Sequence, residues 1–117
     1  MPASVEVELD IFSGMPNPRW TLTRAEADHL VERLAALPRA PARSWQGNLG
    51  YRGFVVQLAQ GPDAQSARIQ AGTAHIASPG TSVYAHDAHR ELERWLLDTG
   101  RPHLKDEVFQ AAARELP

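Results

Sequence analysis

The strongest constraint on the fold is a strict alternation of apolar and acidic residues near the start of the chain. It runs over residues 5–11, where Val5, Val7, Leu9 and Ile11 are separated by Glu6, Glu8 and Asp10. A period of two places successive side chains on opposite faces of a β-strand. We therefore predict a strand here, with an apolar face against the core and an acidic face toward water, in a sheet whose second side is partly open to solvent.

Local signals predict three helices. Thr23 and Glu26 have capping-box spacing, so a helix should begin at Arg24 and end before Pro38. Its apolar residues recur at helical spacing, and the predicted buried stripe comprises Ala27, Leu30, Val31, Leu34 and Leu37. Asp87 is a suitable N-cap for a second helix, which Gly100 should end. A third helix is predicted over residues 106–115.

The remaining apolar segments predict strands over residues 51–59 and 67–71, with the second continuing to Ile76 if Gly72 forms a bulge. These two should pair as a hairpin, and residues 82–84 suggest a short edge strand. The helix between the first two strands allows a parallel pairing through a right-handed crossover. The predicted fold is therefore α+β, a two-layer mixed sheet of three to four strands in the order β-α-β-β-(β)-α-α, with helices packed on one face.

Length and composition exclude several classes of protein. A chain of 117 residues can enclose one core, so residues 1–117 are treated as a single domain. The absence of cysteine excludes disulfide scaffolds, thiolate metal sites and a cysteine nucleophile. A net charge of -2 gives no general attraction to nucleic acid or to an anionic membrane. No apolar run approaches the roughly 20 residues of a membrane helix, and no leader is apparent, so we expect a soluble, cytoplasmic protein.

The first candidate binding segment is the loop of residues 12–20, Phe-Ser-Gly-Met-Pro-Asn-Pro-Arg-Trp. It leaves the end of a strand and leads to a helix N-terminus, a place where open α/β sheets often bind ligands. Its two prolines would stiffen it, so that Ser13, Asn17, Arg19 and Trp20 could be presented at a small entropic cost. The alternative is that Asn17 caps its own turn and Trp20 packs on the core.

The second candidate is the segment of residues 38–52. No acidic residue occurs between Glu32 and Asp63, whereas this segment holds Arg43, Tyr51 and Arg52. Arginine with aromatic neighbours suits a carboxylate, a phosphate or an acidic peptide. The alternative is a solvated loop whose arginines balance the acids of the first strand and helix. Together the two segments predict a binding or accessory protein that recognises a small anionic ligand or a protein partner.

No catalytic residue or cofactor is predicted. His86 and His89 flank Asp87, so a small, metal-assisted enzyme is the alternative function, although their spacing matches no standard metal motif and Asp87 is also needed as a cap. Within residues 92–102, Leu97 falls off the apolar stripe. This helix is therefore either buried on two sides or exposes an apolar patch for a homodimer.

Overall fold

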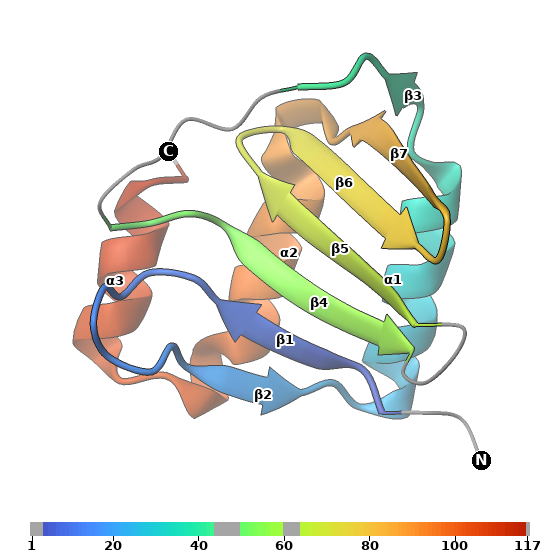
Figure 1. The fold of residues 1–117 in the computed structure, drawn as a ribbon. Helices are drawn as coiled ribbons and strands as arrows, with labels where there is room; N and C mark the ends of the chain where they lie inside the picture. Colours follow the sequence, from blue (N-terminus) through green and yellow to red (C-terminus); the bar gives the residue numbers. More distant parts are fainter. Residues whose placement is uncertain (1–3, 44–49, 60–63, 117) are drawn as a thin grey trace.

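The computed structural model describes residues 4–43, 50–59 and 64–116. Within them the strands are β1 (Glu6–Leu9), β2 (Arg19–Thr21), β3 (Arg39–Ala40), β4 (Phe54–Ala59), β5 (Gln65–Gln70), β6 (Thr73–Ser78) and β7 (Thr81–His86). The helices are α1 (Arg24–Ala36), α2 (Glu91–Gly100) and α3 (Asp106–Arg114), with short 3-10 turns at η2 (Ala88–Arg90) and η3 (Arg101–His103). All seven strands form one antiparallel sheet in the order β2-β1-β4-β5-β6-β7-β3 (Figure 1).

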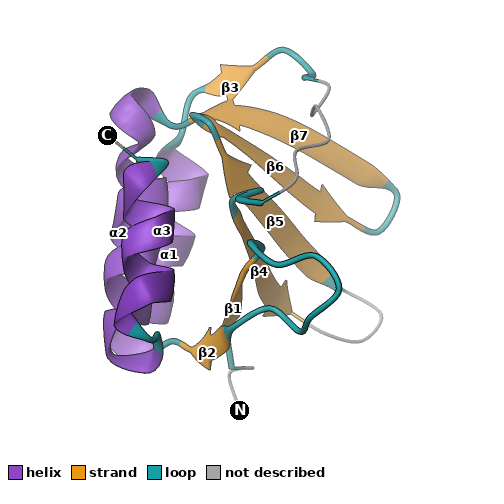
Figure 2. Ribbon diagram, turned by 90° about the vertical axis from the view of Figure 1, so that its left-hand side faces the viewer, coloured by secondary structure: helices purple, strands orange, loops and turns teal. Residues whose placement is uncertain are grey.

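The three helices lie on the same side of the sheet, and no described helix or strand covers the other side (Figure 2). The α+β class and the one-sided placement of the helices are therefore confirmed. None of the described helices is long and apolar enough to span a bilayer. We refer below to the side of the sheet away from the helices as the open face.

The predicted sheet of three to four strands, with a parallel first pair, is wrong. β2 and β3 have only three and two residues, too few to show an alternation, and both lie in segments interpreted as loops. The parallel pairing assumed a single crossover from the first strand to the next. In the structure β2 and β3 also intervene, and β4 returns antiparallel to β1. The predicted edge strand over residues 82–84 is the longer β7, with β3 outside it.

The bulge considered at Gly72 is a hairpin turn instead. Ala71 and Gly72 both have positive φ, of 52° and 83°, and they separate β5 from β6. Positive φ at both central residues suits a two-residue turn, because its twist matches the twist of the strands. Alanine is uncommon at a position with positive φ, so the residue types give no clear signal for this turn.

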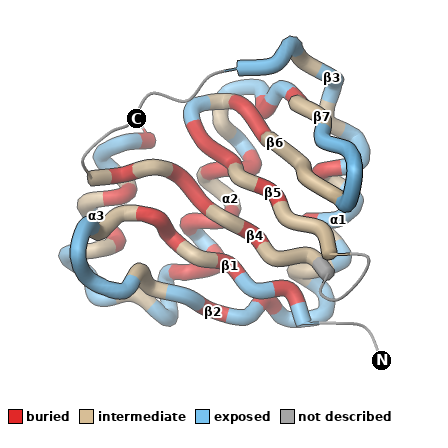
Figure 3. The backbone as a smooth tube through the Cα atoms, in the orientation of Figure 1, coloured by how far each residue is buried: buried red, intermediate tan, exposed pale blue. Residues whose placement is uncertain are grey.

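The core lies between the helices and the apolar face of the sheet. Figure 3 shows that buried positions recur along the central strands and along the helices. Its fully buried members from the strands include Val7, Leu9, Phe54, Val56 and Ile69. The alternation predicted for the first strand is confirmed over β1, where Glu6 is exposed and Glu8 is half-buried, but not beyond it, because Asp10 follows the end of β1 and is buried. The paired hairpin of β4 and β5 is confirmed as well.

The capping box of α1 is confirmed: the Glu26 amide donates to the Thr23 hydroxyl, and the Thr23 amide donates to the Glu26 carboxylate. The buried stripe of this helix is narrower than predicted. Leu30 and Leu34 are buried, but Val31 is 53% exposed. The apolar face of α1 is thus only partly covered by the sheet.

Asp87 caps α2 across an intervening turn. Its two carboxylate oxygens accept from the amides of Leu92 and Glu93, at 2.9 and 3.0 Å. The chain reaches this position through His89 and Arg90, which both have left-handed backbone angles. The predicted cap is therefore present, although the α-helix itself begins four residues after it. α3 matches its predicted range closely.

Candidate functional site

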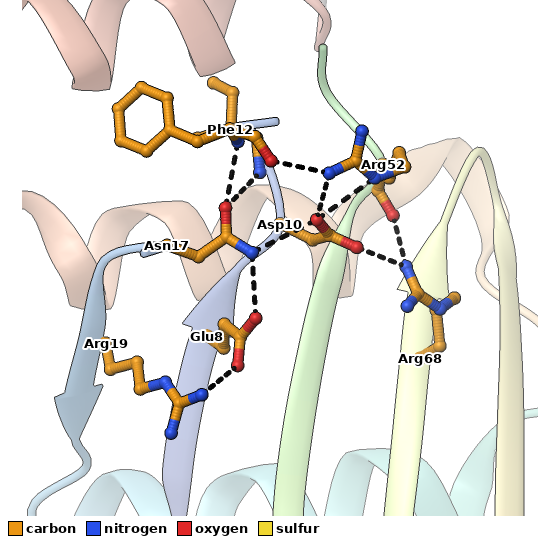
Figure 4. Close-up of polar contacts among 8 residues, drawn as sticks. Glu8, Asp10, Phe12, Asn17, Arg19, Arg52 and Arg68 are labelled. Atoms are coloured by element: carbon orange, nitrogen blue, oxygen red, sulfur yellow. Dashed lines mark hydrogen bonds and ion pairs between the residues drawn. The ribbon is translucent and has the colours of Figure 1, made fainter. Parts of the chain in front are cut away.

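Asn17 fastens the loop between β1 and β2 onto the open face (Figure 4). Its Oδ1 accepts from the amides of Ile11 and Phe12, at 3.1 and 2.9 Å. Its Nδ2 donates to Glu8 Oε2 at 2.9 Å and to Asp10 Oδ1 at 3.2 Å. Both ends of the amide are therefore used within the protein. Asn17 therefore stabilises the conformation of its own loop, which is the alternative that the sequence offers to a role in ligand binding.

Asp10 is the centre of the polar cluster on the open face. Its Oδ1 accepts from Arg52 Nη2 at 2.7 Å and from Arg52 Nε at 3.1 Å, and its Oδ2 accepts from Arg68 Nη1 at 3.1 Å. Arg52 also donates to the Phe12 carbonyl, and Arg68 donates to the Arg52 carbonyl. One carboxylate thus joins the end of β1, the entry to β4 and the middle of β5. We call Asp10, Asn17, Arg52 and Arg68 the Asp10 cluster.

The charge of Asp10 is stabilised by its neighbours. Burial acts to raise the pKa of Asp10, but the hydrogen bonds and positive charges of Arg52 and Arg68 outweigh burial, so the pKa of Asp10 lies below its ordinary value. The folded protein therefore favours the ionised form more than the unfolded chain does. This contribution to stability is present above the unfolded pKa, and is lost as the pH falls through the lower pKa of the folded state.

Asp10→Asn should lower the free energy of unfolding at neutral pH by about 1.5–3 kcal/mol, because the two arginines lose their charged acceptor. The difference between wild type and variant should shrink as the pH falls below about 4, where the unfolded wild-type chain takes up a proton at Asp10, and it should shrink further as the pH falls through the lower pKa of Asp10 in the folded state. Urea denaturation at several pH values measures both effects. Asp98→Asn, at an exposed position of α2, is the control and should change little. A difference that grows on acidification would contradict the assignment.

Beside the Asp10 cluster, the open face carries a shallow hollow of about 340 Å³. Its lining residues are Glu6, Glu8, Arg19, Val55 and Gln57. Arg19 reaches from β2 to Glu8 at 3.0 Å and to Glu6 at 3.5 Å. Positive and negative side chains therefore alternate from β2 through β1 toward β5.

Two of the predicted site residues belong to the core. Trp20 is 5% exposed; its Nε1 donates to Thr99 Oγ1 at 3.0 Å, and its ring packs edge-on against Phe54. Tyr51 is also buried and donates to Glu93. Both side chains contact helix α2, so they cannot share a surface with Arg52 on the open face. Of the residues predicted in the two segments, Asn17 and Arg52 come together at Asp10.

The other predicted residues lie apart from the Asp10 cluster. Ser13 is exposed on the loop. Arg43 donates to the Ala71 carbonyl at 3.0 Å and to Thr73 Oγ1 at 3.1 Å, near the β5–β6 turn. Within the predicted 38–52 segment, residues 44–49 lie outside the described residues. Arg68, which sequence reasoning did not select, completes the cluster. Its polar position within an alternating strand was visible, but its neighbours depend on strand register.

A second polar cluster lies inside the protein and was not predicted. Glu93 is fully buried; Arg90 contacts it with two hydrogen bonds of 2.9 and 2.8 Å, and the Tyr51 hydroxyl donates to it. Burial, followed by the charge of Glu93, raises the pKa of Tyr51 strongly. The hydrogen bond to Glu93 raises the pKa of Arg90. These contacts tie the start of α2 to the entry of β4, and we assign them a structural role.

The histidine pair does not form a metal centre with the residues described. His86 and His89 are both exposed, and the Asp87 carboxylate between them is occupied by its two backbone contacts. Among residues 4–43, 50–59 and 64–116, no three histidine, aspartate or glutamate side chains are placed to hold one ion. In α2, Leu97 is buried, which removes the feature that suggested a homodimer through this helix.

Comparisons with protein-family models, with curated proteins and with solved structures give no match for this chain.

Proposed function

We propose that this chain is a binding or accessory protein, acting in the cytoplasm, which recognises a protein partner through the open face of its sheet and the loop between β1 and β2. The observation that supports this most is the Asp10 cluster. Its hydrogen bonds join the loop to Glu8 of β1, to Arg52 before β4 and to Arg68 of β5. A surface ordered before binding loses little conformational entropy when a partner binds.

The charges of this surface favour a protein over a free small anion. Arg52 and Arg68 both donate to Asp10, so an added anion would have to compete with a carboxylate already in place. Arg19 is likewise paired with Glu8 and Glu6. A surface that presents both signs of charge in a fixed pattern is suited to a complementary pattern on another protein, and such a pattern provides specificity.

Met15 supplies an apolar contact next to these charges. It is 58% exposed, between Gly14 and Pro16 in the loop, and this loop stands out from the sheet on the side away from the helices (Figure 2). The flexible thioether side chain of Met15 can adapt to an apolar pocket on a partner, and the loop that carries it is held to the sheet. The metal-assisted enzyme has no comparable observation in its favour.

The proposal can be tested by quantitative affinity purification from the cells that produce the protein. Met15→Asp and Arg19→Glu change the open face, and Arg114→Glu, at an exposed position of α3, is the matched control. A partner recovered equally by wild type and control should fall by about tenfold or more with both face variants, a loss of roughly 1.4 kcal/mol. Circular dichroism should show that all variants remain folded.

Two outcomes would overturn the proposal. One is that every interacting protein is retained by both face variants. The other is that phosphate or citrate raises the melting temperature of wild type but not of Arg68→Gln, which would support the small-anion alternative. If the recovered partner is a second copy of this chain, sedimentation should show a dimer that Met15→Asp dissociates.

A further inference from the structure

Helix α1 leaves an apolar hollow between itself and the sheet. The helix runs behind the sheet (Figure 1). A hollow of about 350 Å³ is lined by residues of α1 and of the strands β4, β6 and β7. Its apolar walls are formed by Val31, Leu34, Leu58, Ile76 and Val83. This volume lies within the range of small-molecule sites.

A second hollow continues the first along α1. It measures about 360 Å³ and shares two lining residues, Val31 and Leu58, with the first. Val5, Leu22 and Ala27 contribute further apolar surface. Because the two hollows share these residues, we treat them as one groove along α1 and call it the α1 groove.

The first hollow of the α1 groove has one charged side chain, Arg39, whereas Arg24 and Asp28 line the second hollow beside its apolar residues. Arg39 lines the first hollow, and no acidic side chain does. Within the described residues the Arg39 side chain makes no hydrogen bond or ion pair, while its backbone pairs with Ala85 in the short ladder between β3 and β7. The hydroxyls of Ser78, Thr81 and Ser82 line the same hollow. Apolar walls, hydroxyl groups and one guanidinium that has no partner among the described residues match an apolar chain that ends in a carboxylate.

Val31 shows that the fold itself does not fill this groove. It lies on the apolar side of α1 predicted from the sequence, yet it is one of only two large apolar side chains exposed among the described residues. Covering exposed apolar surface gains about 25 cal/mol per Å². An alkyl chain that covers Val31 and Leu58 would therefore make binding more favourable, while the head group of the ligand contacts Arg39.

We propose that the α1 groove binds a medium-chain monocarboxylate, with the carboxylate on Arg39 and the alkyl chain over Leu58 and Val31. The groove lies between the sheet and a helix, whereas the surface proposed for partner recognition is the open face. The two proposals therefore rest on different residues and can fail separately.

Isothermal titration calorimetry with octanoate, below the concentration at which it forms micelles, tests this proposal. Wild type should bind one octanoate, and Arg39→Gln should bind it about tenfold more weakly. Octan-1-ol, which has the same chain without the charge, should bind wild type and Arg39→Gln equally. Arg114→Gln, another exposed arginine, is the matched control and should bind octanoate like wild type.

Val31→Trp places a large side chain in the groove at an exposed helix position, so the fold should tolerate it. It should abolish octanoate binding while the melting temperature without ligand stays close to that of wild type. The proposal is overturned if wild type shows no saturable binding, if Arg39→Gln binds octanoate as tightly as wild type does, or if Val31→Trp leaves the affinity unchanged.

Discussion

Arg90→Ala should lower the free energy of unfolding by about 3–5 kcal/mol, because it leaves a buried carboxylate without its cation. Glu93 is fully buried and accepts two hydrogen bonds from Arg90. The Tyr51 hydroxyl is a single neutral donor and cannot replace the positive charge. Residue 90 has a left-handed backbone conformation, whose energetic cost is similar for alanine and for arginine. The loss of stability in Arg90→Ala therefore comes mainly from the missing side-chain contacts with Glu93. Urea denaturation of wild type and of Arg90→Ala at neutral pH measures this loss in the free energy of unfolding.

Two further variants separate the charge from the rest of the contact. Tyr51→Phe keeps the Arg90–Glu93 pair and should cost about 1.5–3 kcal/mol, the usual effect of losing a hydrogen bond to a charged group. Arg114→Ala removes an exposed arginine and should cost less than about 0.5 kcal/mol. If Arg90→Ala costs no more than Arg114→Ala, then water reaches Glu93 and the assigned structural role is wrong.

Gly53→Ala should destabilise the protein by about 3 kcal/mol or more, for two reasons that add. Gly53 has a φ of +87°, and a residue with a side chain loses about 1–2 kcal/mol in that conformation. A Cβ at this position would also lie 2.4 Å from the Ile69 carbonyl oxygen and 2.6 Å from Gln70 Cβ. Such an overlap with a neighbouring strand typically costs a further 1–3 kcal/mol.

Gly14→Ala isolates the first of these costs. Gly14 has a similar φ of +78°, but a Cβ there would have no neighbour within 4 Å. It should therefore lose only about 1–2 kcal/mol in urea denaturation. Equal losses for the two variants would show that β5 moves aside without cost. We also expect Gly53→Ala to disturb the Asp10 cluster. The Gly53 carbonyl accepts a hydrogen bond from the Asp10 amide, and Gly53 directly follows Arg52.

The elements predicted correctly are those with signals contained in a few adjacent residues. The alternation over residues 5–9, the capping box at Thr23 and the cap at Asp87 each depend on groups close in the chain. β2 and β3 carry no such signal. They are strands only because β1 and β7 offer them free backbone groups, and pairing of that kind depends on residues far along the chain.

The candidate site divides in the same way. Asn17 and Arg52 were selected because of their residue type and their position in loops, and both lie in the Asp10 cluster. Trp20 and Tyr51 are predicted on the same grounds, but both are buried. Trp20 lies in the short strand β2 and Tyr51 lies just before β4, and both side chains point toward α2. Arg68 was not selected, because its closeness to Asp10 requires the register between β4 and β5.

The sequence alone therefore determined which face of the first strand is apolar, where α1 begins and which residue caps α2, because the contacts responsible are local. The tertiary structure alone decided the number and direction of the strands, the neighbours of Asp10 and Glu93, and the incomplete cover over Val31. The physical reason is that these features depend on the pairing of distant strands, and a one-residue change of register would exchange the buried and exposed faces of a strand.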